Sequence, residues 1–297
     1  MMHFGNAERY INSLLSVGES FRLNGECFTI VDCGKPTCKS GEPKTDIYVG
    51  AKSNSGQYIE LKISFKKENA DFLENKTTAK RAEQLFGSIW MDVVINSTLS
   101  IKRHFIERPL IYKNSYGKTS KGSITLGWKF ELVNKPGGNL SGKMLLTEEQ
   151  IIDIYAGTNL DYDKRNAYIG AQKVQDSGIA NYVLNIDYVN STQDVINNLI
   201  PIEKYIKKYH NIYFACKALN YRSFERKYDG DRPLAVFIDW YVCKDKLAHK
   251  YVFDEPLVTK GNKVSKSLLD SMRSLKIKTT DDINNQNIND PSIIYSG

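Results

Sequence analysis

The sequence predicts a mixed α/β fold of the α+β kind, in which helices flank a mixed central sheet and a strand-rich C-terminal lobe is appended. Three observations predict it. Residues 45–50 and 58–65 alternate apolar and polar side chains, as half-buried strands do. Residues 7–15 and 77–97 repeat apolar side chains at helical spacing on either side of those strands. From residue 102 onward the chain turns into short strand-like runs separated by turns.

Length and charge set the organisation that we expect. The 297 residues suffice for a full core. We expect a core domain over residues 1–145, a second lobe that continues the fold over 146–278, and a flexible polar tail over 279–297. The net charge of +7, from 41 Lys+Arg against 34 Asp+Glu, favours a polyanionic partner, although many ordinary enzymes are equally basic.

The first half of the chain predicts helices before and after a hairpin. A short amphipathic helix over residues 7–15 ends near Gly18, and a strand over 26–31 leads into a glycine-rich loop. The two hairpin strands follow, joined by small polar residues and a glycine over 52–57. The long helix over 77–97 comes next.

The second half predicts alternating strands and helices. Thr147 and Gln150 form a capping box for a helix that Gly157 ends. Strands are expected over 108–112, 123–133, 181–188, 211–221 and 234–243, and helices over 192–209, interrupted at Pro201, and over 265–275.

One face of the hairpin predicts a site. On the second strand Glu60, Lys62 and Ser64 share the polar face, and Asp46 precedes the first strand. A register that sets Asp46 opposite Lys62 also sets it diagonal to Glu60. We therefore expect two carboxylates and an amine on the polar side of a small sheet.

This combination of side chains suits phosphodiester hydrolysis. Two carboxylates with carbonyl and water oxygens suit Mg²⁺, which lowers the pKa of a bound water, and a lysine orients that water or shares the phosphate charge. The alternative is a solvated strand face, because the acid-x-Lys spacing also begins at Glu42, Glu74 and Glu225. Glu60 alone of the four lies in an alternating apolar strand.

Asp46 followed by Glu60-Leu61-Lys62, with a helix on either side, resembles the PD-(D/E)XK nuclease superfamily, in particular type II restriction endonucleases. Thr45 stands where the family name has proline. The resemblance implies a restriction-endonuclease-like core, Asp46 and Glu60 as ligands of Mg²⁺ or its substitute Mn²⁺, the Leu61 carbonyl as a further ligand, and Lys62 as the catalytic lysine.

Further residues are candidates for accessory or DNA-binding roles. The acidic residue that relatives supply from the preceding helix corresponds to Glu8, and Glu83 and Gln84 are candidate polar groups near the metal. An ordinary helix-surface acid is the alternative for Glu8. The candidate DNA-binding residues are basic or amide side chains in loops and at a helix start: Lys66, Lys67, Lys76, Lys80, Arg81, Lys113, Lys118, Lys121, Lys173, Gln175, Arg222, Arg226, Lys227 and Arg232. Solvated loops are the alternative reading of the same pattern.

Several site classes find no support in the sequence. The five cysteines include no Cys-x-x-Cys pair, so neither a zinc site nor a disulfide framework is indicated. Neither a P-loop nor a dinucleotide fingerprint occurs, so we expect no nucleotide cofactor. The chain has no signal-peptide pattern and no apolar run of membrane-spanning length, which predicts a cytoplasmic protein without membrane contact.

The sequence therefore favours a Mg²⁺-dependent endodeoxyribonuclease. The expected form is a sequence-specific type II restriction enzyme that cuts double-stranded DNA as a homodimer, since two sites make a two-strand cut most simply. The alternatives are a repair, recombination or phage-type nuclease that reads DNA structure, and a non-catalytic nucleic-acid-binding protein.

Overall fold

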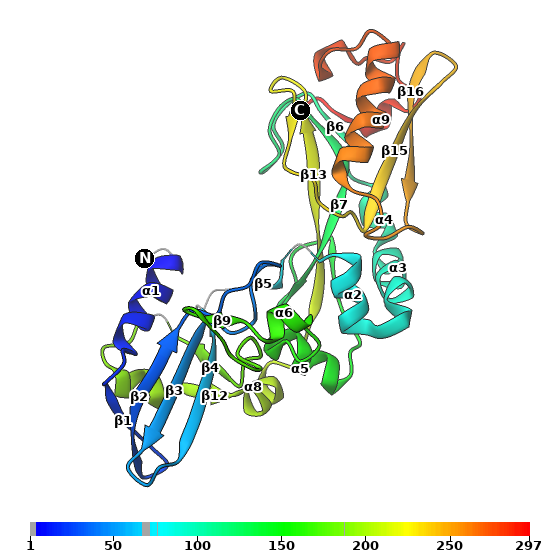
Figure 1. Cartoon of the computed structure of the whole chain (residues 1–297). Helices are drawn as coiled ribbons and strands as arrows, with labels where there is room; N and C mark the ends of the chain where they lie inside the picture. Colours follow the sequence, from blue (N-terminus) through cyan, green and yellow to red (C-terminus); the bar gives the residue numbers. More distant parts are fainter. Residues whose placement is uncertain (1–3, 67–71, 76, 187) are drawn as a thin grey trace. The chain divides into compact units, whose positions relative to one another are not determined.

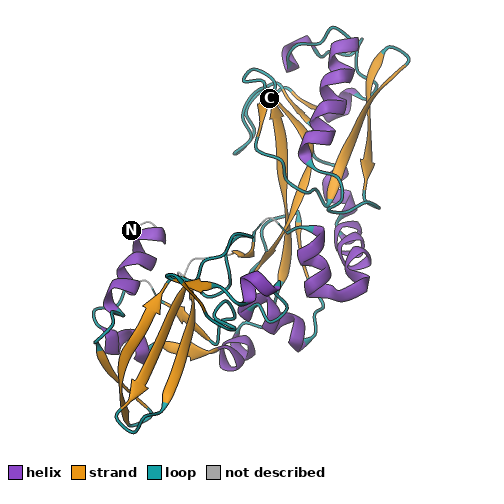
Figure 2. Ribbon diagram, in the orientation of Figure 1, coloured by secondary structure: helices purple, strands orange, loops and turns teal. Residues whose placement is uncertain are grey.

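The fold was analysed in a computed structural model, which describes residues 4–66, 72–75, 77–186 and 188–297. These residues form two compact units, each made of two chain segments. The first unit comprises Met1–Asp71 and Leu146–His210, and the second comprises Phe72–Leu145 and Asn211–Gly297. Both contain helices and strands, so the predicted α+β class is confirmed (Figures 1 and 2).

The first unit is built on a mixed sheet with the strand order β1-β2-β3-β4-β11-β12. Its strands are β1 (Ser20–Leu23), β2 (Glu26–Gly34), β3 (Ile47–Ser53), β4 (Tyr58–Lys66), β11 (Tyr182–Asn185) and β12 (Leu199–Pro201). Neighbours pair antiparallel except β4 and β11, which run parallel. Parallel strands cannot be joined by a tight turn, so the chain returns to this sheet only after a long excursion.

Helix α1 (Phe4–Leu14) and helix α7 (Thr192–Asn197) cover one face of this sheet. The apolar stripe of α1, Ala7 and Ile11 with Leu15 after its end, packs with the inward residues of β3 and β4 in one buried cluster. The predicted alternation is confirmed, because Leu61 and Ile63 are buried there while Glu60 and Lys62 lie on the other face.

The rest of the first unit is α5 (Glu148–Ala156), α6 (Tyr162–Arg165), the hairpin of β9 (Tyr168–Ile169) and β10 (Gln172–Lys173), and α8 (Ile202–Lys208). The predicted capping box of α5 is confirmed, and Gly157 ends the helix in the left-handed conformation, with φ of 80°. Pro201 interrupts the predicted 192–209 helix, and the interruption contains strand β12.

The second unit is built on another mixed sheet, with the path β14-β13-β7-β15-β16. These strands are β14 (Lys227–Tyr228), β13 (Tyr213–Arg222), β7 (Ser123–Val133), β15 (Val236–Cys243) and β16 (Lys246–Val252). Four short strands extend it: β5 (Phe72–Glu74) and β6 (Ile111–Tyr112) pair with β7, β8 (Ser141–Lys143) with β13, and β17 (Ile294–Tyr295) with β6.

Helix α9 (Gly261–Ser274) packs on β15 and β7 of this sheet (Figure 1). The buried Trp240 of β15 donates its indole N–H to the Thr125 carbonyl of β7 at 3.0 Å, which ties neighbouring strands together. The remaining helices are α2 (Ala79–Phe86), the short η1 (Gly87–Ile89), α3 (Trp90–Ser100) and α4 (Lys102–Ile106).

Two expectations about the chain differ from the structure, one about the helix over 77–97 and one about the tail. The helix expected over 77–97 breaks at Gly87, whose φ of 69° an α-helix does not allow. The strands expected over 211–221 and 234–243 are both present, as β13 and β15, and β7 lies between them in the sheet. The tail expected to be flexible over 279–297 is ordered, with Ile283, Ile288 and Ile293 buried.

The expected division of the chain also changes. A change of unit does fall at residues 145 and 146, but each unit takes one segment from either side of that point. The physical reason is the long-range pairing of β11 with β4 in the first unit and of β13 with β7 in the second. Residues 1–145 are therefore not one domain, and 146–278 are not another.

Candidate active site

Four charged side chains meet where strands of the first unit end. Asp46 directly precedes β3, Lys66 is the last residue of β4, and Lys35 directly follows β2. Glu8 joins them from α1 through an ion pair of 2.9 Å between its Oε1 and Lys35 Nζ. All three other groups lie close enough to Asp46 to alter its pKa. We call these four residues the strand-end cluster.

Backbone hydrogen bonds hold Asp46 in place. Its N–H donates to the Ile63 carbonyl at 2.8 Å, and the Phe65 N–H donates to Asp46 Oδ2, also at 2.8 Å. Burial raises the pKa of Asp46 from 3.8 to about 6, although Lys66 and the Phe65 N–H act in the lowering direction. With this pKa the carboxyl is mostly ionised at neutral pH and its charge is poorly solvated, so a cation that binds it meets little competition from protons.

Lys35 neutralises Glu8 in this arrangement. The Glu8 side chain is only 12% exposed and that of Lys35 is 44% exposed, so the ion pair is partly open to water. Burial lowers the pKa of Lys35, but the hydrogen bond and charge of Glu8, with Glu42 and Asp46, outweigh it and raise that pKa overall. A cation that binds Glu8 must therefore compete with the Lys35 ammonium.

The pairing of β3 with β4 differs from the expected register by two residues. Tyr48 stands opposite Lys62 and Gly50 opposite Glu60. Continued past Ile47, which faces Ile63, this register sets Asp46 opposite Ser64. Glu60 lies four residues before Ser64 on β4, about 13 Å away at the usual strand rise. The expectation that Asp46 and Glu60 lie within reach of one ion is therefore wrong for this structure.

The reason for the difference is the hairpin turn. Strand β3 continues to Ser53, whose N–H donates to the Gln57 carbonyl at 2.8 Å, so the turn is shorter than expected and centred farther along. A slip of two residues returns every side chain to the same face, so the apolar alternation cannot distinguish the two registers.

Two buried oxygens at the strand end are not hydrogen-bonded in the part of the chain that the structure describes. The Ser64 hydroxyl lies across from Asp46, and Asn185 stands beside Lys66 in the parallel β4/β11 register. Within the described residues, Ser64 Oγ and Asn185 Oδ1 have no hydrogen-bond partner. Leaving such an atom unpaired costs about 1–3 kcal/mol. Two oxygens at the same strand end are thus available to a bound ion or its water shell.

Glu60 and Lys62 belong to a different group, which we call the mid-strand cluster: Tyr48, Tyr58, Glu60 and Lys62. The Tyr48 hydroxyl donates to Glu60 Oε1 at 2.7 Å and lies 3.1 Å from the Tyr58 hydroxyl. Lys62 Nζ lies 3.6 Å from Glu60 Oε2. Burial raises the pKa of Tyr48, and the hydrogen bonds with Tyr58 and Glu60 act in the same direction. The polar groups here satisfy one another.

Backbone contacts also fix this part of β4. Asn181 accepts from the Lys62 N–H at 2.7 Å and donates to the Glu60 carbonyl at 2.9 Å. Leu61 lies between them with its side chain in the core, opposite Val49. The roles expected for Glu60, Leu61 and Lys62 stay predictions, but these residues are not part of the strand-end cluster.

The strand-end cluster fits a magnesium ion better than a zinc ion. The described ranges contain no group of three or more His, Cys, Asp or Glu side chains placed to hold a metal. Mg²⁺, in contrast to structural zinc, takes one or two carboxylates and keeps several waters. Asp46 and Glu8 supply two carboxylates, and the unpaired Ser64 and Asn185 oxygens are of the same hard type.

The other accessory candidates belong to the second unit. Glu83 and Gln84 lie in α2, where the Glu83 carbonyl accepts from Gly87 at the helix end. Their roles near a metal stay predictions.

Many of the candidate DNA-binding residues are engaged in ion pairs. Arg222 bonds both Glu225 and Asp229, and Lys227 Nζ lies 2.7 Å from Glu225. Arg81 pairs with Glu74 at 2.8 Å, Lys121 with Asp281 at 3.9 Å and Lys173 with Asp163 at 3.4 Å. Arg222 therefore has a structural task in its turn that the sequence did not suggest.

The remaining candidates lie in varied places. Lys66 is in the strand-end cluster, Lys80 in α2, Lys118 beside the Tyr116–Thr119 bridge and Arg226 at a left-handed position with φ of 52°. Arg232 accepts the Gly261 N–H through its carbonyl. Lys67 and Lys76 lie outside the described residues.

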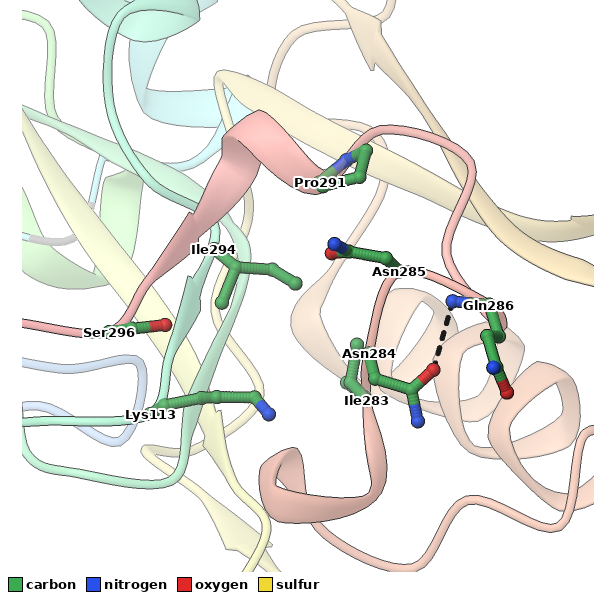
Figure 3. A pocket seen from close by; sticks show the side chains of 8 residues that line it. All are labelled: Lys113, Ile283, Asn284, Asn285, Gln286, Pro291, Ile294 and Ser296. Atoms are coloured by element: carbon green, nitrogen blue, oxygen red, sulfur yellow. Dashed lines mark hydrogen bonds between the residues drawn. The ribbon is translucent and has the colours of Figure 1, made fainter.

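Lys113 and the C-terminal segment line a cavity of about 510 Å³ in the second unit. Figure 3 shows Lys113 and Asn285 extending into it from opposite walls, while Asn284 accepts from the Gln286 N–H at 2.9 Å. Carboxamides and a lysine are suited to base edges and phosphates. Because the C-terminal segment was expected to be flexible, this cavity was not predicted.

Sequence reasoning did not single out three residues at the strand end: Lys35, Ser64 and Asn185. Ser64-Phe65-Lys66 continues the polar alternation of Glu60-Leu61-Lys62, and that continuation was the available signal. Lys35 and Asn185 arrive through contacts between segments far apart in the sequence, which local patterns do not reveal.

Searches against protein-family models, curated proteins and solved structures found no match to this chain. Within the described ranges, none of the helices combines the length and the apolar character needed to cross a membrane. The functional argument therefore depends on the residues of the site themselves.

Proposed function

We propose that the chain is a Mg²⁺-dependent endonuclease that hydrolyses DNA phosphodiester bonds at the strand-end cluster. The observation that carries the proposal is Asp46, a partly exposed carboxylate whose pKa is raised to about 6 by desolvation, beside a second carboxylate and a lysine. Ionisable groups with shifted pKa values concentrate at functional sites. The net charge of +7 supports a polyanionic substrate.

The resemblance to PD-(D/E)XK nucleases is kept in a revised form. In the observed register, Ser64-Phe65-Lys66 rather than Glu60-Leu61-Lys62 faces Asp46. Ser64 then occupies the position of the second acid, and Glu8 of α1 supplies the missing carboxylate. Lys66 takes the position of the catalytic lysine. This assignment keeps the metal ligands and the lysine of the family pattern in one place.

In the proposed reaction, water attacks phosphorus, the P–O bond to the leaving sugar oxygen breaks, and the water proton passes to solvent while the leaving oxygen is protonated. When bound, Mg²⁺ would lower the pKa of the attacking water and neutralise charge on the phosphate. Asp46 and Glu8 would hold the ion. The Lys66 ammonium would orient the water and share the phosphate charge. Lys35, released from Glu8, would be free to contact a neighbouring phosphate.

The finer form of the proposal is a sequence-specific type II restriction enzyme that cuts double-stranded DNA as a homodimer, with Mn²⁺ able to replace Mg²⁺. A nuclease that reads DNA structure would share the same chemistry. The competing class is a non-catalytic nucleic-acid-binding protein, which the Glu8–Lys35 ion pair of 2.9 Å favours because it uses the second carboxylate.

The test is cleavage of mixed plasmid and phage DNA by the full chain with Mg²⁺, with EDTA, and with Asp46→Asn protein shown to be folded. We expect cleavage that EDTA and Asp46→Asn both abolish. Discrete bands would establish sequence specificity, and a smear would favour the structure-reading form. Cleavage that survives both treatments would contradict this active site, and DNA binding without cleavage under every condition would support the binding protein.

A further inference from the structure

A pair of cavities lies beside the loop that leads to Asp46. The larger, about 630 Å³, is lined by Tyr162, Arg165, Asn166, Lys173, Gln175 and Asp176. The other, about 490 Å³, is lined by Thr37, Cys38, Lys39, Asp163, Tyr168 and Lys173. Lys173 belongs to both walls, so the two cavities are neighbours. Their volumes fall in the usual range of about 300–1,000 Å³ for sites that bind small molecules.

Each cavity carries an exposed aromatic ring. Tyr162 is 72% exposed and Tyr168 is 45% exposed. Lys173 Nζ lies 4.6 Å from the Tyr162 ring centre and 5.9 Å from that of Tyr168. A cation between two aromatic rings that face solvent is a combination suited to nucleotides, since the rings stack on bases and the ammonium meets phosphate.

The polar groups of the larger cavity differ in their availability. Both ends of the Asn166 carboxamide are hydrogen-bonded. Its nitrogen donates to the Tyr162 carbonyl at 3.0 Å, and its oxygen accepts from the Asp176 N–H at 3.0 Å. These bonds fix the backbone around Tyr162. Arg165 is bound to Asp176. The exposed carboxamide of Gln175 has no hydrogen bond recorded among the described residues and is suited to a base edge.

Hydrogen bonds hold the segment that lines these cavities against the loop between β2 and Asp46. Thr37 and Tyr168 exchange two backbone hydrogen bonds, of 2.9 and 2.8 Å. The Lys44 N–H donates to the Gly178 carbonyl at 3.1 Å, and a Cβ at Gly178 would lie only 3.1 Å from Pro43 Cβ, so the two segments approach closely. Lys35 is two residues from Thr37, a span of about 7 Å at most.

We propose that these cavities hold unpaired nucleobases of a DNA strand, one stacked on Tyr162 and one on Tyr168, with Lys173 on the intervening phosphate. The inference relies on the proposed function in taking DNA as the ligand. A base inside a duplex is stacked on its neighbours and cannot lie on a tyrosine until it leaves the helix. The protein therefore binds DNA with unpaired bases more tightly than fully paired duplex of the same sequence.

The test measures binding of the full chain to a fluorescein-labelled single strand and to its duplex, by fluorescence anisotropy in EDTA, where no metal-dependent cleavage takes place. The variants are Tyr162→Ala, Tyr168→Ala and Tyr162→Phe. The matched control is Tyr188→Ala, which removes a tyrosine of the same unit that is 65% exposed and lines neither cavity.

We expect the wild type to prefer the single strand. Loss of a stacked ring weakens single-strand binding roughly 5- to 150-fold, whereas Tyr162→Phe keeps the ring and stays within about twofold of wild type. Tyr188→Ala should bind as wild type does. In a salt series, Lys173→Gln should lower the slope of log K against log salt by about 0.7, the value for one phosphate contact on a single strand.

The inference is overturned if duplex binds as tightly as the single strand, if Tyr188→Ala weakens binding as much as Tyr162→Ala, or if neither DNA binds. It is equally overturned if Tyr162→Phe matches Tyr162→Ala, because the hydroxyl and not the ring would then be responsible. Failure of the nuclease proposal shows separately, as absent cleavage with Mg²⁺, so the two failures are distinguishable.

Discussion

The strand-end and mid-strand clusters both involve strands β3 and β4 and both combine carboxylates with lysines, but their hydrogen bonding differs. In the mid-strand cluster the Glu60 carboxylate receives the Tyr48 hydroxyl at 2.7 Å and faces Lys62 at 3.6 Å. At the strand end, burial raises the pKa of Asp46 to about 6, and two neighbouring oxygens have no partner in the described part of the chain. The first group is complete without a ligand, and the second is not.

This difference indicates which of the two clusters is the better candidate for binding a ligand. A satisfied polar network stabilises a fold and has little to gain from a ligand. An unsatisfied one costs stability that a bound cation can return. The acid-x-Lys spacing identifies only the mid-strand cluster, whereas the unpaired oxygens identify the strand end.

A Glu→Gln substitution should change the DNA cleavage rate strongly in the strand-end cluster and little in the mid-strand cluster. Glu8→Gln removes a proposed metal ligand and should lower the DNA cleavage rate on the order of 10²- to 10³-fold. Glu60→Gln should leave that rate within about threefold, because Gln keeps an acceptor for Tyr48. Initial rates of plasmid nicking at saturating Mg²⁺ measure both. The reverse order would return the active site to the mid-strand cluster.

The next effect concerns the stability of metal-free protein. A folded-state pKa above the unfolded value means that the contribution of Asp46 is most favourable below pH 3.8 and is lost as pH rises through about 6. Asp46→Asn removes this loss and still accepts from the Phe65 N–H. In EDTA at pH 8 it should raise the free energy of unfolding by up to about 3 kcal/mol.

Urea unfolding between pH 5 and pH 8 measures that prediction. The advantage of Asp46→Asn over wild type should shrink steadily as pH falls below about 6, where the Asp46 carboxyl takes up its proton. Glu60→Gln, the matched control in the mid-strand cluster, should lower stability at every pH in this range. An Asp46→Asn protein less stable than wild type at pH 8 would show that the carboxylate is satisfied after all.

A smaller effect is expected at Tyr48. Tyr48→Phe deletes the hydroxyl that donates to Glu60 Oε1 at 2.7 Å while keeping the buried ring. The variant should lose about 1.5–3 kcal/mol of stability, the usual contribution of a hydrogen bond to a charged group, with no change in cleavage rate. Thermal unfolding and nicking assays on one preparation test both halves. A cleavage defect without a stability change would place Tyr48 in the chemistry.

Local patterns predicted much of the fold, because their causes are local. The Thr147 capping box, the end of α5 at Gly157 and the strand over Ser123–Val133 all depend on neighbouring residues. The β3/β4 register could not be predicted, since alternation has a period of two and a two-residue slip leaves it unchanged. The parallel pairing of β11 with β4, which brings Asn185 beside Lys66, depends on segments more than a hundred residues apart.

The same limits apply to the candidate site. Asp46 and Lys66 were identified because charged residues beside apolar strands are visible in the sequence, and Glu8 because the resemblance implies an acidic residue in the preceding helix. Their grouping was not, since it depends on the register and on the return of β2 to the strand end at Lys35. The ordered C-terminal segment was missed for a related reason: its three buried isoleucines lie at five-residue intervals among polar residues, a spacing that matches neither a helix nor a strand.

The smallest expected effect tests the role of Lys35. Its ammonium pairs with Glu8 at 2.9 Å and so occupies one carboxylate that a metal would use. Lys35→Gln removes this competing charge and should tighten Mn²⁺ binding by roughly two- to fivefold, in line with about 0.5–1 kcal/mol for a partly exposed ion pair. Calorimetric titration of each protein with Mn²⁺, in the absence of DNA, measures this affinity. Lys62→Gln, which alters the mid-strand cluster instead, should leave Mn²⁺ affinity unchanged. Equal changes in both variants would mean that the ion responds to overall charge rather than to a carboxylate at the strand end, whereas a change at Lys35 alone would locate the ion beside Glu8.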